Sequence, residues 1–311
     1  MAPRKIALVG IGKIARDAHI PSIAASEDWV LAAAVSRHEQ AEGVPNYATL
    51  SEMLSRHPDI GTVSLCVPPG PRFAYASEAL AAGRHVMLEK PPGATLSEVE
   101  KLSQMARSQG LTLFATWHSR AAPYVDAAKD WLGDKTLRSM QVTWKEDVRK
   151  WHPGQDWVFE PGGMGVFDPG INALSIVTKI LPDQLHLKTA ELDFPANRET
   201  PIAARLDFDH TGGAVVGAEF DWDHQGDDIW SIHVETDAGS LTLENGGAVM
   251  KIDGAAAEAP LAGLSGEYPR LYHQMATLVA DGRSDVDVAP LRQVADAFLI
   301  GRRRIVSAFA W

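Results

Sequence analysis

The chain has 311 residues, of which 45% are hydrophobic and 22% charged, and this length and composition suit a globular protein of two domains. Its formal net charge of −11 argues against a nucleic-acid partner, because phosphate binding needs a concentrated basic surface. No apolar run reaches the roughly 18 residues that a membrane helix needs, so we expect no membrane partner.

Short apolar runs alternate with amphipathic stretches over the first 120 residues. We expect strands at residues 5–9, 30–36, 62–67, 85–89 and 111–116, and helices among the intervening segments at 74–82 and 96–109. Strands and helices that alternate through short connections are typical of right-handed βαβ units and a parallel sheet. We therefore predict an α/β domain over residues 1–120.

The pattern changes after residue 120, where strands follow one another with few helices between them. We expect strands at residues 137–147, 187–194, 202–208, 214–220, 230–236 and 249–252, and helices at 121–131, 170–180, 268–280 and 290–308. Successive strands with polar–apolar alternation favour an antiparallel sheet with helices on one face. We predict an α+β domain over residues 121–311 with an open, mostly antiparallel sheet.

A glycine-rich turn, GIGKIA at residues 10–15, follows the first expected strand. Gly10 and Gly12 permit a tight turn and the close approach of a pyrophosphate, and Lys13 and Ile14 lie in the same turn. Ala15 takes the place of the third glycine of the dinucleotide-binding fingerprint and still allows close helix–strand packing. The turn predicts a dinucleotide site, and the alternative is a glycine turn without a ligand.

The second expected strand ends at Ser36, Arg37 and His38, where an acidic residue would favour the 2′-hydroxyl of NAD. A hydroxyl and a guanidinium suit a 2′-phosphate instead, because arginine offers a planar fork of donors. We therefore expect NADP to be preferred, with NAD still accepted. The alternative is that Arg37 stacks on adenine or is solvated.

Special residues also follow the later strands of the predicted parallel sheet. Cys66 and Pro68 lie at the VPPG turn, and His118 lies in the WHSR turn. In parallel sheets ligands bind outside the carboxyl ends of the strands, so we expect all three to contact the cofactor. Arg120 follows in the same turn, and for His118 and Arg120 a structural role at the domain junction is an equal alternative.

The strand at residues 85–89 ends on Glu89 and Lys90, and Pro91 and Pro92 prevent its continuation. The prolines place Glu89 and Lys90 at the same binding edge of the sheet. The alternative for Lys90 is an ordinary surface lysine in a turn.

Three motifs in order, the GxGxxA turn near residue 10, the Glu-Lys-Pro near residue 90 and a GG-x₄-D-x-G segment at residues 162–170, resemble the Gfo/Idh/MocA oxidoreductases over nearly the whole chain. The resemblance implies a Rossmann dinucleotide-binding domain and an α+β domain whose open sheet often forms the interface of a homodimer. Asn172 stands where most members carry a histidine. Together with the sequences of residues 144–157 and 167–182, this asparagine makes the chain resemble the aldose 1-dehydrogenases that oxidise D-galactose or L-arabinose to the lactone.

The resemblance places Lys90 at the reacting carbon and the nicotinamide ribose, where it orients O1 of the sugar. An asparagine cannot act as a base near neutral pH, so Asp168 is our first choice for the catalytic base and Lys90 the second. Asn172 follows Asp168 by one helical turn on the same face and is expected to bind a sugar hydroxyl. The alternative for Asp168 is a helix N-cap.

The segment at residues 144–157 is expected to run from a strand into a loop over the site. We favour Glu146 and His152 as sugar contacts, whereas Trp151 has equal claims as a sugar platform and as core. Among other functions, a dinucleotide or sugar sensor without turnover and a dehydrogenase of another sugar or an inositol stay open.

No metal site is expected, since the histidines lack ligand spacing. The single cysteine, Cys66, cannot form an intrachain disulfide, and the apolar run at residues 6–11 is too short for a signal peptide. These features predict a reduced, cytoplasmic protein.

Overall fold

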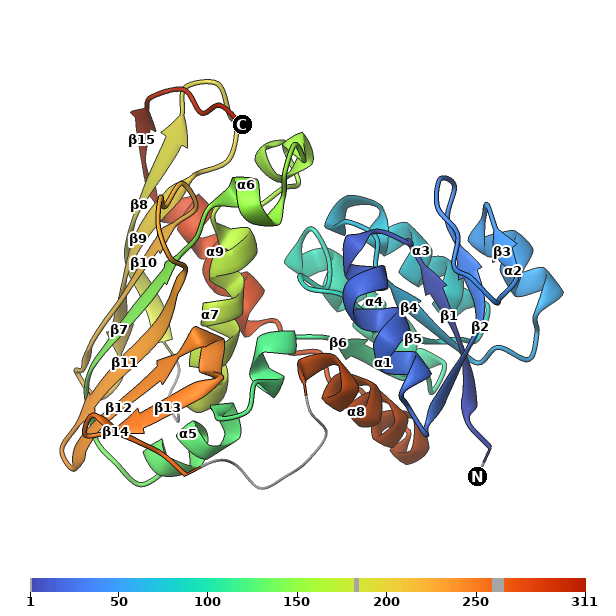
Figure 1. Ribbon diagram of the computed structural model, residues 1–311, viewed down its shortest axis with the longest axis horizontal. Coiled ribbons are helices and arrows are strands. Elements are labelled where there is room, and N and C mark those ends of the chain that lie inside the picture. The colour runs from blue at the N-terminus through green and yellow to red at the C-terminus, as the bar shows by residue number, and fades with distance from the viewer. Residues whose placement is uncertain (1, 182–184, 259–265) are drawn as a thin grey trace. The chain divides into compact units, whose positions relative to one another are not determined.

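The computed structural model describes residues 2–181, 185–258 and 266–311 (Figure 1). They group into two compact units. The first unit contains the chain up to His118 and a later segment that includes α8 (Glu267–Asp281) and ends at Val288. The second unit contains the chain from Ser119 up to that later segment, and Ala289–Trp311. This division differs from the predicted one, which assigned everything after residue 120 to the second domain.

The first unit contains a six-stranded sheet in the order β3-β2-β1-β4-β5-β6, and every neighbouring pair is parallel. The strands are β1 (Arg4–Val9), β2 (Trp29–Val35), β3 (Asn46–Tyr47), β4 (Thr62–Leu65), β5 (His85–Leu88) and β6 (Leu113–Ala115). The helices are η1 (Ala15–His19), α1 (Ile20–Ala24), α2 (Leu50–Arg56), α3 (Pro69–Ala81), α4 (Leu96–Ser108) and α8 (Glu267–Asp281). The predicted Rossmann sheet is confirmed.

Local sequence explains these elements. The central strands are apolar on both faces, as in a parallel sheet covered by helices, and Ile6, Leu8 and Val63 are fully buried. Thr49 and Thr95 are the N-caps of α2 and α4, and each hydroxyl accepts a backbone N–H three residues later, at 3.3 Å and 3.2 Å.

Helix α8 belongs to the first unit because its polar groups are bonded there. The hydroxyl of Tyr272 lies 2.7 Å from Nδ1 of His19, and its carbonyl accepts the indole N–H of Trp29 at 2.8 Å. After α8, Asp285 pairs with Phe114 next to β6. These contacts connect the helix to elements that lie far from it in the sequence.

The second unit contains a nine-stranded sheet in the order β14-β13-β12-β11-β7-β10-β9-β8-β15. The pairs β7–β10 and β8–β15 are parallel and the others are antiparallel. The strands are β7 (Leu137–Lys145), β8 (Leu185–Pro195), β9 (Ala203–His210), β10 (Val215–Asp221), β11 (Ile229–Thr236), β12 (Gly239–Glu244), β13 (Val249–Ile252), β14 (Ala255–Ala256) and β15 (Arg302–Val306). The mostly antiparallel sheet is confirmed.

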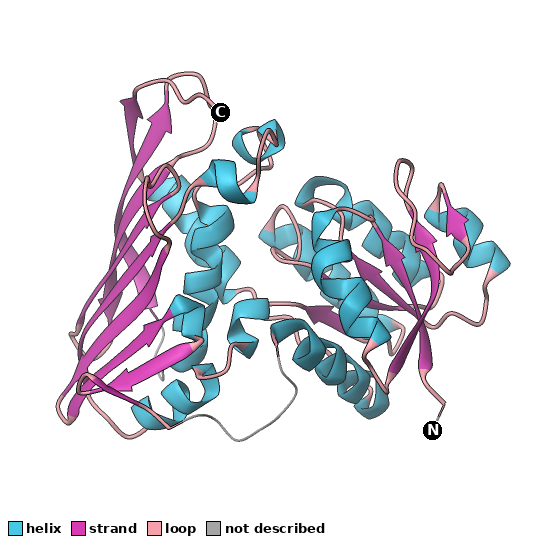
Figure 2. Ribbon diagram, viewed as in Figure 1, coloured by secondary structure: helices cyan, strands magenta, loops and turns pink. Residues whose placement is uncertain are grey.

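Helices of the second unit lie on one face of this sheet, and within the described residues the other face carries no helix (Figure 2). They are η2 (His118–Ala121), α5 (Val125–Leu132), α6 (Val148–Trp151), η3 (Asp156–Phe159), α7 (Phe167–Ile180) and α9 (Ala289–Ile300). Helix α7 and the loop before it therefore lie on the covered side, which is where the carboxyl-terminal end of β7 continues into α6.

One helix prediction was wrong. The pattern at residues 290–308 predicted a single helix, but α9 ends at Ile300 and β15 follows as a strand parallel to β8. Gly301 allows the change of direction, because a Cβ there would lie 2.3 Å from the Ala297 carbonyl oxygen and 2.9 Å from Leu192. The strand β12 was not predicted.

Candidate functional site

The turn after β1 has one glycine required by packing and one that faces open space. Gly10 has φ +89°, and a Cβ there would lie 2.9 Å from Cγ1 of Val67, so the turn packs tightly against the residues after β4. A Cβ at Gly12 would meet nothing within 4 Å. Gly12, Lys13 and Ile14 are exposed. The chain's own packing leaves the space over Gly12 free, which fits the approach of a dinucleotide pyrophosphate.

The other residues expected at the cofactor lie just after the neighbouring strands. Ser36 follows β2, and its hydroxyl accepts the backbone N–H of Glu39 at 3.3 Å, while Arg37 and His38 are exposed. Cys66 and Pro68 follow β4. All of these positions are at the carboxyl ends of parallel strands, the edge where ligands bind in such sheets.

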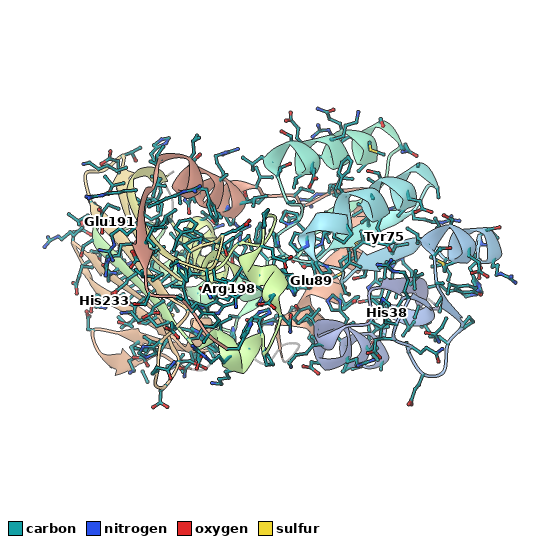
Figure 3. All side chains as sticks on the ribbon, turned by 90° about the horizontal axis from the view of Figure 1, so that it is seen from above. His38, Tyr75, Glu89, Glu191, Arg198 and His233 are labelled. Atoms are coloured by element: carbon teal, nitrogen blue, oxygen red, sulfur yellow. The ribbon has the colours of Figure 1, made fainter. Side chains whose placement is uncertain are left out.

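Glu89, which is labelled in Figure 3, is the centre of a buried polar network in the first unit. It is 4% exposed, and its Oε1 lies 3.0 Å from Nε2 of His19 and accepts the hydroxyls of Tyr268 at 3.0 Å and Thr116 at 3.3 Å. Its Oε2 accepts the backbone N–H of Lys90 at 3.1 Å. Burial opposes ionisation, but the hydrogen bond and charge of His19 outweigh it and lower the pKa of Glu89 to about 2.

His19 completes this network. The ring is fully buried between Glu89 and the Tyr272 hydroxyl. Burial lowers the pKa of His19, but interactions with Cys66, Tyr272 and Glu89 raise it well above its ordinary value. The hydrogen bonds of His19 and Glu89 therefore hold the backbone at Lys90.

A buried arginine, Arg72, connects the turns after β4 and β5. Its guanidinium donates to the carbonyl oxygen of Glu89 at 2.7 Å and to the carbonyls of Val67 and Pro91. It is 2% exposed. The Lys90–Pro91 peptide bond is cis. The hydrogen bonds of Arg72 hold the Glu-Lys-Pro turn in one conformation.

His118 and Arg120 have protein partners of different kinds. Nδ1 of His118 lies 2.7 Å from the Glu267 carboxylate, and the ring stacks on Tyr268 with centroids 5.7 Å apart. Burial lowers the pKa of His118, but Glu267 outweighs it and raises the value. In the second unit, Arg120 donates to the Ser175 carbonyl at 2.9 Å and to the Thr178 hydroxyl at 2.8 Å, so its described contacts hold α7.

Glu146 lies immediately after β7 in the second unit, between two tryptophans. Trp222 donates its indole N–H to Oε1 at 3.1 Å, and Trp230 donates to Oε2 at 2.8 Å. The residue is 6% exposed. Burial, together with the charges of Asp168 and Asp228, raises the pKa of Glu146 to about 7, although both indole hydrogen bonds lower it.

Asp168 lies in the first turn of α7, with its Oδ2 3.2 Å from Nε2 of His152. It is not the N-cap, which is Val166. The Trp157 indole can only donate, and it donates to Oε1 of Gln155 at 3.1 Å. Nδ1 of His152 lies 3.3 Å from the same oxygen and must carry a proton to bond to it. In the neutral His152 ring Nε2 then carries no proton. The Asp168 carboxylate and Nε2 can therefore form a hydrogen bond only when the pair gains one proton.

The structure thus brings Glu146, His152 and Asp168 together in one polar cluster of the second unit. His152 and Asp168 contact each other, and Glu146 is connected to them through Trp222. The ring of Trp222 links them, because it donates to Glu146 and contacts the His152 ring at 5.4 Å between centroids. Asn172 follows Asp168 by one turn of α7 and is half-buried. Trp151 packs against Trp230 at 5.6 Å.

Sequence reasoning missed His19, Arg72, Tyr268, Trp222 and Trp230. None of them lies in a motif, and except for Arg72 their partners are distant in the chain: Tyr268 and Glu89 are 179 residues apart. The signal available for the tryptophans was only their number, nine in the chain. Lys90 and its network lie in the first unit, whereas Asp168 and its cluster lie in the second.

Neither a metal cluster nor a membrane-spanning helix occurs among the described residues. Within residues 2–181, 185–258 and 266–311 there is no group of three or more histidine, cysteine, aspartate or glutamate side chains that could hold a metal ion. No helix in these ranges is both long and apolar enough to span a membrane.

Comparisons with known proteins agree with the fold. Residues 4–116 match the model of the GFO_IDH_MocA family, described as oxidoreductases with an NAD-binding Rossmann fold. Galactose 1-dehydrogenase from Pseudomonas fluorescens is 45% identical over 309 residues, which cover 99% of each chain. The crystal structure of a D-galactose-1-dehydrogenase protein from Rhizobium etli is 54% identical, with a TM-score of 0.95 over 100% of this chain and 99% of that one.

A more distant structure shares the fold alone. KijD10, a 3-ketoreductase from Actinomadura kijaniata in complex with NADP and TDP-benzene, is 19% identical, with a TM-score of 0.84 over 98% of this chain and 99% of that one.

Proposed function

The chain belongs to the Gfo/Idh/MocA oxidoreductase family, and from this premise we propose that it oxidises an aldopyranose, D-galactose or L-arabinose, at C1 to the lactone, with hydride transfer to NADP or NAD. The observation that carries the proposal is the cluster of Glu146, His152 and Asp168 beside tryptophan rings. Carboxylates and an imidazole accept sugar hydroxyls, and indole faces cover sugar C–H surfaces. Two full-length relatives named for galactose oxidation support the choice of sugar.

Oxidation at C1 removes a proton from the anomeric hydroxyl and a hydride from the carbon. The bound nicotinamide ring supplies the hydride acceptor. Asp168 is the proposed base, because its bond to Nε2 of His152 forms only when the pair has gained one proton. Lys90 orients O1 and is the second candidate for the base, and Glu146 and Asn172 bind sugar hydroxyls.

A spectrophotometric assay tests the reaction directly. Purified protein is mixed with NADP, and separately with NAD, and the absorbance of the reduced cofactor is followed after D-galactose, L-arabinose, D-glucose or myo-inositol is added. Reduction with galactose or arabinose, and formation of the lactone, is the expected result. No reduction with any sugar, despite measurable cofactor binding, would favour a sensor of the same fold. Reduction only with inositol or another sugar would retain the enzyme and change the substrate.

We also propose that Arg37 gives a preference for NADP. It is exposed beyond the end of β2, where a guanidinium can bind a 2′-phosphate. Arg37→Ala should raise KM for NADP about tenfold or more, the value of one lost charge-assisted bond, and leave KM for NAD nearly unchanged. Arg107→Ala, at an exposed arginine in the last turn of α4, is the control. Equal effects of Arg37→Ala on both cofactors would rule out the assignment.

A further inference from the structure

Glu146 receives one hydrogen bond from each neighbouring strand region. It follows β7, which lies between β10 and β11 in the sheet. Trp222, one residue after β10, donates to Oε1, and Trp230 of β11 donates to Oε2. A carboxylate has about four lone-pair sites, so two remain for other donors. The sheet therefore holds both oxygens of this carboxylate in one orientation.

We propose that Trp222 and Trp230 are positioning residues that act through Glu146: their indole N–H groups orient its carboxylate and favour its ionised form, so that the remaining lone pairs accept sugar hydroxyls. This inference rests on the proposed function, in which Glu146 binds the sugar. It assigns the two indoles a task other than covering the sugar ring.

The groups around Glu146 make the indole bonds decisive. Burial and the negative charges of Asp168 and Asp228 oppose its ionisation. The positive or ionisable side chains in the same cluster face other groups: Lys150 bonds to Asp228, and Nε2 of His152 lies 3.2 Å from Asp168. His224 contacts Glu146 through its backbone N–H, at 3.3 Å from the Glu146 carbonyl oxygen. Removing an indole donor should therefore raise the pKa of Glu146 above its value of about 7.

Trp144 provides a matched control within the same cluster. Its ring stacks on Trp230 with centroids 5.9 Å apart, and it is 4% exposed. Its indole nitrogen is buried and has no hydrogen-bond partner among the described residues. Trp144→Phe and Trp230→Phe thus remove similar aromatic area from the same stack, and only the second removes a bond to Glu146.

The experiment compares sugar kinetics of the full-length variants at a series of pH values. Trp230→Phe should raise KM for D-galactose about tenfold and move the acidic limb of kcat/KM upward by about one pH unit, since one unit corresponds to a tenfold change. Trp144→Phe should change KM for D-galactose by no more than about twofold and should leave the acidic limb of kcat/KM at its wild-type pH. Glu146→Gln should abolish the limb that Trp230→Phe moves, which separates Glu146 from His152 as its source.

An active wild type with superimposable profiles for Trp230→Phe and Trp144→Phe would overturn the inference and leave the proposed function intact. An inactive wild type would instead contradict the proposed function. If circular dichroism shows that Trp230→Phe does not fold, the indole N–H resonances of the wild type are followed by NMR as the pH is changed. At least two resonances should then titrate together near pH 7 and lose this titration in Glu146→Gln, and the absence of such a pair would overturn the inference.

Discussion

Asp168 and His152 form a contact in the second unit whose hydrogen bond requires a proton between the two side chains. Their atoms lie 3.2 Å apart, and Gln155 fixes the other ring nitrogen as a donor. A base that gains a proton in this arrangement gains a hydrogen bond at the same time. The geometry therefore supports Asp168 as the proton acceptor of the proposed reaction, with His152 as the group that stabilises the protonated pair.

Asp168→Asn should lower kcat for D-galactose at least about a hundredfold, the usual contribution of a general base. The amide keeps a polar contact with His152 but cannot accept a proton near neutral pH. Asp209→Asn, at an exposed aspartate of β9 that pairs with Lys188, is the control and should keep wild-type turnover. If Asp168→Asn retained more than a tenth of the turnover, Asp168 would not be the base.

Glu89 provides a prediction on stability and its pH dependence. Its folded-state pKa of about 2 is below the ordinary 4.5, so its stabilising contribution is complete above pH 4.5 and is lost as the pH falls toward 2. Glu89→Gln should lower the free energy of unfolding at pH 7 by about 3 kcal/mol, because it leaves His19 without its charged partner.

Urea unfolding of both proteins at several pH values measures this effect. The difference between wild type and Glu89→Gln should shrink as the pH decreases below 4.5. Glu52→Gln, in an exposed pair with Arg56, should show almost no difference at any pH. A difference for Glu89→Gln that stays constant down to pH 3 would show that Glu89 is not ionised by this network.

At the residue scale, the sequence indicated side chains but not their contacts. Glu146, His152 and Asp168 were each selected from a motif or a loop position, and the structure brings them into one cluster. Their partners Trp222 and Trp230 were not indicated, because an indole N–H donor carries no motif and strand register decides which carboxylate it reaches. The network of His19 and Glu89 depends on contacts over long sequence distances, which no local pattern encodes.

At the scale of elements, the turn after β1 separates a glycine needed for folding from a glycine available to a ligand. Gly10→Ala should lower the free energy of unfolding by about 2 kcal/mol, because φ is +89° and Val67 lies 2.9 Å from the new Cβ. Gly12→Ala meets no atom within 4 Å and should leave stability unchanged. It should nevertheless weaken NADP binding about tenfold, since the methyl group occupies the space proposed for the pyrophosphate.

Thermal unfolding and fluorescence titration with NADP measure the two effects on the same proteins. Each glycine variant serves as the control for the other. Unchanged NADP affinity in Gly12→Ala would show that the pyrophosphate does not approach this turn. A stable Gly10→Ala would contradict the required backbone conformation.

The prediction of elements succeeded where the hydrophobic periodicity agreed with the residues that begin or end an element. The parallel strands follow apolar runs that end at glycine, proline or charge, and helix α4 follows its threonine N-cap, Thr95. The error at residues 290–308 has a physical cause. The apolar residues Ile305 and Val306 continue a helical spacing, but Ile305 is 73% exposed in β15, where pairing with β8 replaces burial as the stabilising contact.

At the scale of the whole molecule, the two units were predicted but their interleaving was not. The amphipathic pattern of α8 shows that one face of the helix is buried, but it does not show which unit covers that face. The covering contacts come from Trp29 and His19, which bond to Tyr272. The Rossmann unit is therefore built from two separate pieces of the chain.

This interleaving predicts which fragments fold. A fragment of residues 2–118 lacks α8 and Asp285, so His19, Trp29 and Glu89 each lose one buried hydrogen-bond partner, at a cost of about 1–3 kcal/mol each. Such a loss is comparable to the whole stability of a domain of this size. The fragment should show no cooperative urea transition and no NADP binding.

A fusion of residues 2–118 to 266–288 through a short Gly/Ser linker should restore both properties. The linker can be short because His118 and Glu267 are bonded at 2.7 Å, so the two ends that it joins already lie side by side. The same fusion with Tyr272→Phe and Tyr268→Phe removes the two hydroxyl bonds to His19 and Glu89 and should unfold at a lower urea concentration. A cooperative transition in the fragment of residues 2–118 alone would mean that the parallel sheet is stable without α8, and that the buried network serves the position of Glu89 rather than the folding of the unit.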